Sequence, residues 1–147
     1  MIRLLALTLL LAFPGGVHAQ FAVPRACLPQ AVRLHVVSWH DRDGFNNLNL
    51  GAALRWSGGL TVGGFNNSVG RPSWYGGIVI TPIESHALQL ELMVGAITGY
   101  SESSPADLVA VPSLGWHLSP RNTLQVVFVP RLVIPANVVH VMFERRL

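Results

Sequence analysis

The sequence predicts an all-β protein: a small, eight-stranded antiparallel transmembrane β-barrel that follows a cleaved signal peptide. Three observations predict this fold class. The chain starts with a targeting signal, its remainder has no helix-length apolar run, and short segments alternate between apolar and other residues. Half of the 147 residues are hydrophobic and only 12% are charged, a composition that favours a membrane protein.

The first 19 residues contain the three parts of a secretory signal. Residues 1–3 include a basic residue, residues 4–13 are apolar, and Val17-His18-Ala19 is typical of a cleavage site. An uncleaved anchor is the alternative, although the apolar stretch is shorter than the roughly 20 residues that a membrane-spanning helix needs. We therefore expect a signal peptide over 1–19, a short N-terminal lead over 20–31 and an outer-membrane β-barrel over 32–147.

Alternation with a period of two marks the strands. In the segment 87–98, apolar side chains alternate with polar ones, as in Leu88-Gln89-Leu90-Glu91, so one face of the strand is apolar. The same pattern and the turn residues between segments give eight candidate strands: 32–39, 48–56, 60–66, 73–81, 87–98, 108–116, 123–130 and 137–145. Segment 108–116 is so uniformly apolar that its faces stay unassigned.

An even number of such strands with an apolar face is typical of a closed barrel, because lipid cannot pair with an open sheet edge. A secreted β-sandwich is the alternative, but its outward face would be polar. Tryptophans near the ends of the expected strands favour the barrel, because Trp is enriched at membrane interfaces; these are Trp39, Trp56, Trp74 and Trp116.

The expected orientation follows from an N-terminus in the periplasm. The connections 40–47, 67–72, 99–107 and 131–136 are then surface loops, and 57–59, 82–86 and 117–122 are periplasmic turns. The shortest connection, 57–59, falls on the periplasmic side, as expected for a bacterial barrel.

The side chains expected inside the barrel divide by height. The periplasmic half is polar: Arg33, His35, Arg55, Thr61, Gln89, Glu91, Thr123, Gln125 and Glu144. The outer half is largely apolar: Val37, Phe65, Tyr75, Met93, Val127 and Val129. An eight-stranded barrel has no open aqueous pore, so the polar half is expected to be a hydrogen-bonded plug. The apolar half is interpreted as a pocket for an acyl chain, or as a core filled by its own side chains.

Other classes of site have little support. The ten basic residues are scattered and form no stripe for nucleic acid. His35 and His140 alternate toward the interior, but no further ligand spacing accompanies them, so we expect no metal site. We expect no cofactor, and a single cysteine, Cys27, excludes an intramolecular disulfide.

Two loops supply candidate catalytic residues. The first surface loop starts at His40 and the second contains Asn67-Ser68. In acyl transfer, a histidine takes the proton of a serine hydroxyl whose oxygen attacks a carbonyl. Both positions lie at the outer end of the expected barrel, on the first and third strands.

At these residues the chain resembles the outer-membrane lipid A palmitoyltransferase (PagP-like) family, over roughly residues 32–145. The matching pieces, in order, are Trp39-His40, Asn67-Ser68, Val111-Pro112 before Gly115-Trp116, the run from Gln125 to Pro130, and Asn137-Val138 leading to Met142. The resemblance implies an eight-stranded barrel that holds an acyl chain in its outer half. It implies a catalytic histidine at His40, a catalytic serine at Ser68, and lateral openings flanked by Pro112 and Pro130.

Two departures bear on activity. The family has an aspartate directly before the serine, where this chain has Asn67, and an amide cannot stabilise an imidazolium as a carboxylate does. In serine proteases the corresponding change of the triad aspartate to asparagine lowers the rate about 10⁴-fold. The family also starts with an amphipathic helix, whereas residues 20–31 are short and carry Pro24 and Pro29.

The resemblance implies an outer-membrane acyltransferase that moves palmitate from a phospholipid donor to a lipid A acceptor, with His40, Asn67 and Ser68 as its catalytic residues. We expect a monomer in the cell outer membrane. The alternative is a non-enzymatic outer-membrane barrel of related descent that binds lipid or serves as a surface structural protein.

Overall fold

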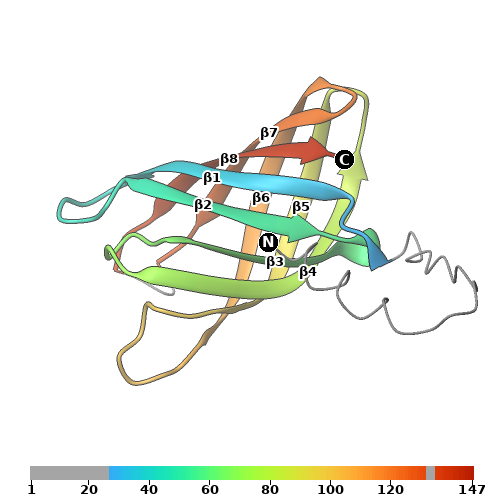
Figure 1. The fold of residues 1–147 in the computed structure, drawn as a ribbon. Coiled ribbons are helices and arrows are strands. Elements are labelled where there is room, and N and C mark those ends of the chain that lie inside the picture. The colour runs from blue at the N-terminus through green and yellow to red at the C-terminus, as the bar shows by residue number, and fades with distance from the viewer. Residues whose placement is uncertain (1–26, 132–134) are drawn as a thin grey trace, which may run out of the picture.

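The chain folds into a closed antiparallel β-barrel (Figure 1). The structure is a computed structural model that describes residues 27–131 and 135–147. Each strand pairs with the next, and β8 returns to β1. The strands are β1(Ala31–His40), β2(Leu48–Arg55), β3(Leu60–Asn66), β4(Pro72–Glu84), β5(Leu88–Ile97), β6(Asp107–Ser119), β7(Asn122–Val129) and β8(Val138–Arg146).

All eight strands expected from the alternation are confirmed, with boundaries that differ by a few residues at most. The largest differences are at the turn-side ends of β4 and β6, which each continue three residues further, to Glu84 and Ser119. Among the residues described, none forms a helix long and apolar enough to cross a membrane. The expected signal peptide, 1–19, and most of the expected lead, 20–31, lie outside the described residues.

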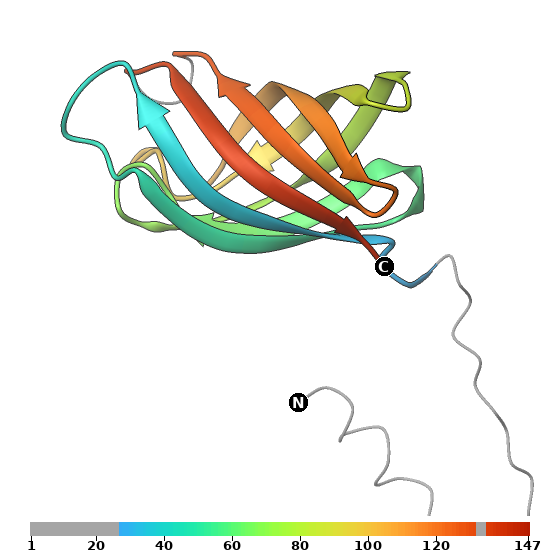
Figure 2. The ribbon, with the colours of Figure 1, turned by 90° about the horizontal axis from the view of Figure 1, so that it is seen from above.

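The two ends of the barrel differ, and we name them by their connections. The loop end carries the long connections 41–47, 67–71, 98–106 and 130–137, and the turn end carries the short ones (Figure 2). The shortest connection joins Ser119 of β6 to Asn122 of β7, and the connection from β2 to β3 contains Ser57–Gly59, where Gly58 and Gly59 have φ of 77° and 84°. Positive φ angles cost glycine little because it has no Cβ atom, so these two residues allow β2 to reverse directly into β3.

The barrel has an apolar outside and a polar inside. Large apolar side chains on all eight strands are exposed on the outer face, such as Leu50 (56% exposed), Ile80 (53%) and Leu114 (50%). The largest side chains that are fully buried are instead polar or charged: Gln89, Gln125, Glu91, Glu144, Asn49 and Asn67. This is the inverse of a water-soluble β-sandwich, in which apolar side chains fill the space between the sheets.

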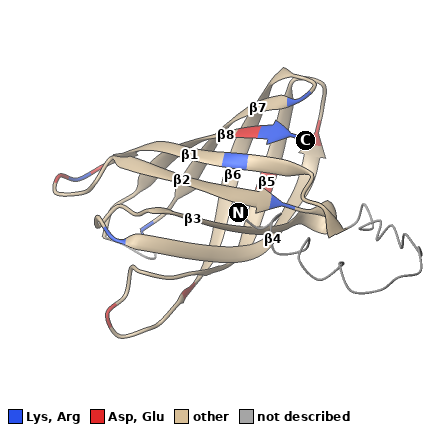
Figure 3. Ribbon diagram, viewed as in Figure 1, with Lys and Arg blue, Asp and Glu red and all other residues tan. Residues whose placement is uncertain are grey.

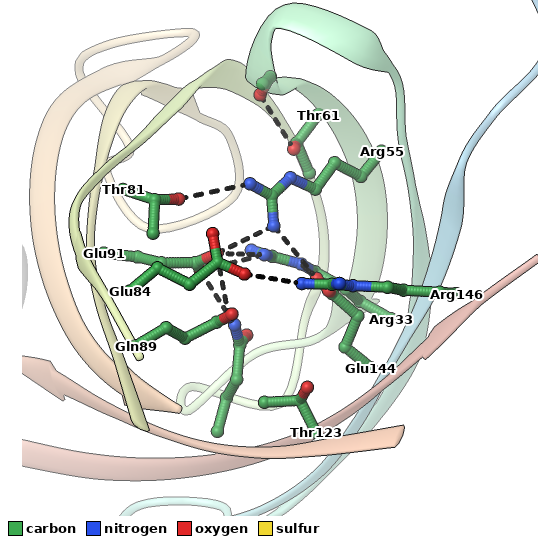
Figure 4. Close-up of polar contacts among 12 residues, drawn as sticks. Arg33, Arg55, Thr61, Thr81, Glu84, Gln89, Glu91, Thr123, Glu144 and Arg146 are labelled. Atoms are coloured by element: carbon green, nitrogen blue, oxygen red, sulfur yellow. Dashed lines mark hydrogen bonds and ion pairs between the residues drawn. The ribbon is translucent and has the colours of Figure 1, made fainter. Parts of the chain in front are cut away.

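Four charged side chains fill the turn-end half of the interior (Figure 4). The Arg33 guanidinium lies 2.6 Å from Glu144 and 2.8 Å from Glu91, and the Arg55 guanidinium lies 2.7 Å from Glu91. Amide groups of Gln89 and Gln125 donate to the same Glu91 carboxylate at 3.1 and 2.7 Å. The charges balance, and Arg33 and both glutamates are almost fully buried. The expected polar plug is therefore present, and we call it the charge cluster.

The loop-end half of the interior differs from the expectation in one strand. A β-bulge between His35 and Val37 inserts one residue into β1 and shifts its register against β2 and β8. Beyond the bulge, Ser38 is buried, whereas Val37 is only half-buried. An extra residue reverses which side chains point inward. The prediction that Val37 faces the interior was therefore wrong, and the inward residue is Ser38.

The charge cluster generates the first testable prediction. Replacing Arg33 with Met should lower the free energy of unfolding by about 3–5 kcal/mol, because the buried carboxylates of Glu91 and Glu144 would lose a partner. Urea unfolding of the protein refolded in detergent micelles measures this change. Arg71→Met is the matched control, because the Arg71–Glu102 pair is exposed and surface pairs contribute little. Equal unfolding midpoints for the two variants would contradict the assigned role of the cluster.

Candidate active site

An apolar cavity occupies the loop-end half of the barrel interior, above the charge cluster. Its volume is about 110 Å³. It reaches from Ser68 in the second loop down to Arg33 of the charge cluster. About half of its lining residues are apolar side chains from β5 to β8: Met93, Ile97, Val109, Val111, Val127, Val129, Val138 and Met142. An apolar space of this kind favours a hydrocarbon ligand.

Most of the residues expected to form an acyl pocket line this cavity. Phe65, Tyr75, Met93, Val127 and Val129 all contribute to its wall. Val37 is not among its lining residues, because the bulge in β1 turns it away. β6, whose faces the sequence left unassigned, contributes Val109, Val111 and Ser113.

His40 and Ser68 meet at the loop end of the barrel. The Nε2 atom of His40 lies 2.7 Å from the Ser68 hydroxyl oxygen. Ser68 is buried and lines the cavity, and its carbonyl accepts a hydrogen bond from the backbone N–H of Asn46 at 2.7 Å. Phe45 stacks on the imidazole with ring centroids 4.9 Å apart. These contacts orient a histidine nitrogen toward a serine hydroxyl beside an apolar cavity.

The other nitrogen of the His40 ring contacts Asn47. The Nδ1 atom lies 2.8 Å from the Asn47 side-chain oxygen. An amide oxygen only accepts hydrogen bonds, so Nδ1 carries the proton and Nε2 presents its lone pair to the Ser68 hydroxyl. This is the tautomer that a general base requires. A histidine oriented by an asparagine also occurs in papain-like proteases.

Asn67 has a different position from the one expected. Its side-chain oxygen accepts hydrogen bonds from the backbone N–H groups of Val69 and Arg71, at 3.0 and 2.8 Å, and its amide donates to Ser73 and to the Gly99 carbonyl. It is completely buried. The Asn67 amide therefore fixes the backbone of the loop that carries Ser68 and does not contact His40 directly.

Asp41 follows His40 but is directed toward another loop. Its carboxylate accepts hydrogen bonds from the Arg131 guanidinium and from both the backbone and the side chain of Asn137. The hydrogen bond from Arg131, followed by those from Asn137, holds the pKa of Asp41 below its ordinary value. Asp41 therefore links the first loop to the connection between β7 and β8. The hydrogen-bond partner of His40 Nδ1 is Asn47 instead.

The barrel wall is incompletely paired beside the cavity. The ladder between β6 and β7 starts at the pair Ser113–Val127 and continues toward the turn end. Among the described residues, the part of β6 before Ser113 therefore pairs only with β5. Pro112, which has no backbone N–H, is the first residue of β6 beyond this ladder. Pro130 directly follows β7 on the other side. The two prolines expected to flank a lateral opening thus lie on the two strands where the pairing stops.

The sequence did not predict the role of Asn47 or the inward position of Ser38 in the cavity wall. No alternation marks Asn47, because it lies in a loop. His35 was expected near the periplasmic end, but it lies in the cavity wall, bonded to His140 and Tyr75 at 2.8 Å each. Within residues 27–131 and 135–147, no three His, Cys, Asp or Glu side chains are grouped so that they could hold a metal ion.

Comparison with known proteins supports the fold only. No family model matches the sequence, and no curated protein matches it. The structure is similar to the solution NMR structure of the de novo designed TMB2.3, with a TM-score of 0.56 and 15% sequence identity over 81% of this chain and 95% of that chain. The protein is therefore a closed, eight-stranded antiparallel β-barrel with a histidine–serine pair at the mouth of an apolar cavity.

Separate replacement of Asn67 and of Asn47 with alanine should distinguish the roles of these two residues. Asn67→Ala leaves two backbone N–H groups without an acceptor and should lower the free energy of unfolding by about 1–3 kcal/mol. Asn47→Ala should leave stability nearly unchanged and let the His40 proton redistribute between the two ring nitrogens. ¹⁵N NMR of His40 and urea unfolding measure the two effects. An unchanged His40 spectrum in Asn47→Ala would contradict the assignment of Asn47.

Proposed function

We propose that this protein is an outer-membrane acyltransferase that moves palmitate from a phospholipid to lipid A. The observation that carries the proposal is the hydrogen-bonded series Asn47–His40–Ser68 at the mouth of an apolar cavity inside a barrel. The series supplies a general base and a nucleophile, and the cavity has the chemistry to hold an acyl chain beside them.

The outer surface supports a location in a membrane. Along the strands the charged residues lie toward the turn end or next to the loops, which leaves an apolar band around the barrel (Figure 3). Trp39 and Trp74 are exposed near the loop end, and Trp116 is exposed near the turn end, where Trp56 also lies. An apolar band between two levels of tryptophan is typical of outer-membrane barrels. We accordingly propose the cell outer membrane as the location and a monomer as the working state.

The unpaired stretch between β6 and β7 provides a lateral path from the membrane into the cavity. A phospholipid acyl chain could pass between Pro112 and Pro130 without breaking backbone hydrogen bonds, because the ladder already ends at Ser113 and Val127. The chain would then lie against Met93, Val111 and other apolar side chains of the wall. Its ester group would remain at the level of Ser68.

In the proposed mechanism, the Ser68 oxygen attacks the carbonyl carbon of the phospholipid ester. His40 takes the hydroxyl proton on Nε2 and delivers it to the departing glycerol oxygen, so the ester bond breaks as the acyl–serine bond forms. A hydroxyl group of lipid A then attacks the acyl–serine. His40 takes the proton of this hydroxyl and returns it to Ser68. Asn47 keeps the imidazole oriented in both halves.

Lipid A mass spectrometry tests this function. Cells that make the protein should contain lipid A with one added palmitoyl group, and His40→Ala or Ser68→Ala should reduce this species about 10³-fold or more, because each removes a member of the catalytic pair. The control is Ser103→Ala, which removes an exposed loop serine. Absence of the palmitoylated species, with folded protein in the outer membrane, would instead favour a non-enzymatic barrel that binds lipid or is structural.

The membrane location has a separate test. Leu92→Arg places a charge on the outer face in the middle of β5 and should cost about 2–4 kcal/mol of folding free energy in lipid vesicles, whereas Leu118→Arg near the turn end should cost about 0–1 kcal/mol. Urea titration of folding into vesicles measures both values. Equal costs at the two depths would contradict a membrane-spanning orientation.

A further inference from the structure

Four polar side chains form a continuous hydrogen-bonded series in the wall of the cavity. The Ser38 hydroxyl lies 2.8 Å from Nδ1 of His140, Nε2 of His140 lies 2.8 Å from Nδ1 of His35, and Nε2 of His35 lies 2.8 Å from the Tyr75 hydroxyl. All four are at least 93% buried and all four line the cavity. We call this set the interior chain. It plays no part in the mechanism proposed above.

Both imidazoles of the interior chain are neutral. Neither forms a hydrogen bond with a carboxylate of the described residues, since the nearby Glu91 and Glu144 are bonded to Arg33, Arg55 and glutamine amides. Phe65 stacks on His35 with ring centroids 4.7 Å apart and adds apolar surroundings. An unpaired charge in such a place would cost several kcal/mol.

The donors and acceptors of the interior chain do not balance. A neutral imidazole has one N–H group and each hydroxyl has one O–H group, so the four side chains have four donors, but only three hydrogen bonds join them. Whichever direction the bonds run, one O–H group, on Ser38 or on Tyr75, is left over at an end. No further hydrogen bond involves either hydroxyl among the described residues, and each borders the cavity. A buried donor without an acceptor is unfavourable.

We propose that the cavity binds an acyl chain that carries a hydroxyl group, and that the interior chain is the site that recognises this hydroxyl. The proposal rests on the proposed function only in that an acyl chain occupies the cavity. A ligand hydroxyl accepts a hydrogen bond from the leftover O–H group of Ser38 or Tyr75. A saturated, unsubstituted chain such as palmitate can still occupy the cavity, but it leaves this donor without an acceptor and is therefore bound less tightly.

The geometry places this site a few carbons along the ligand. Ser38 lies two residues before His40 on β1, and two residues of a strand span about 7 Å. An acyl chain with its carbonyl at Ser68 and its tail toward Arg33 therefore passes Ser38 before its midpoint and passes Tyr75, at the other end of the interior chain, further along. A hydroxyl that pairs with Ser38 is expected on the carbonyl-side half of the acyl chain.

Equilibrium binding to the full, folded protein in detergent micelles tests the proposal. The probes are tetradecanoate and its 3-, 5- and 7-hydroxy derivatives, in competition with radiolabelled tetradecanoate. At least one hydroxy derivative should bind about three- to tenfold more tightly than tetradecanoate, as one added hydrogen bond predicts. The double variant Ser38→Ala/Tyr75→Phe should reduce this preference to less than about twofold, because it removes both terminal hydroxyls.

The control variant is Val127→Ala, which alters the same wall without changing a polar group and should keep the preference. Equal binding of plain and hydroxylated acids would overturn the inference. A preference that persists in the double variant would overturn it as well. Neither result affects the lipid A test of the proposed function. A hydroxyl preference without lipid A palmitoylation would support the inference and contradict the proposed function.

Discussion

The charge cluster is the interaction on which the rest of the interior depends. Arg33, Arg55, Glu91 and Glu144 come from four strands, and each charge is matched by an opposite one at hydrogen-bond distance. The cluster fills the turn-end half of the barrel with polar groups that satisfy one another. It therefore closes one end of the interior, so that the apolar space toward the loop end becomes a cavity with a floor rather than a channel.

A single inserted residue in β1 decides which side chains reach that cavity. The bulge between His35 and Val37 reverses the alternation of the strand, so Ser38 is turned inward and Val37 is displaced. The same strand thus supplies Arg33 to the charge cluster, His35 and Ser38 to the interior chain, and His40 to the histidine–serine pair. Three levels of the barrel interior are therefore built on one strand, in the order of its sequence.

The loops complete the site by fixing the two partners of His40. Asn67 holds the second loop through its bonds to Val69 and Arg71, which positions Ser68, while Asn47 in the first loop accepts the Nδ1 proton. Asn67, which stands where the family that the sequence resembles has aspartate, thus has a structural role. The orientation of the imidazole comes from a different asparagine, so the absence of a carboxylate at position 67 does not by itself leave His40 without a hydrogen-bond partner.

The sequence by itself determined the number and limits of the strands, because side chains in a strand alternate with a period of two and the turns are marked by glycine, proline and polar residues. It also determined the polar content of the turn-end half and the pairing of His40 with Ser68 as candidates. Only the tertiary structure decided the role of Asn47, the inward position of Ser38 and the contact of His35 with His140. These depend on a bulge and on loop contacts between distant segments, and a local pattern carries no information about either.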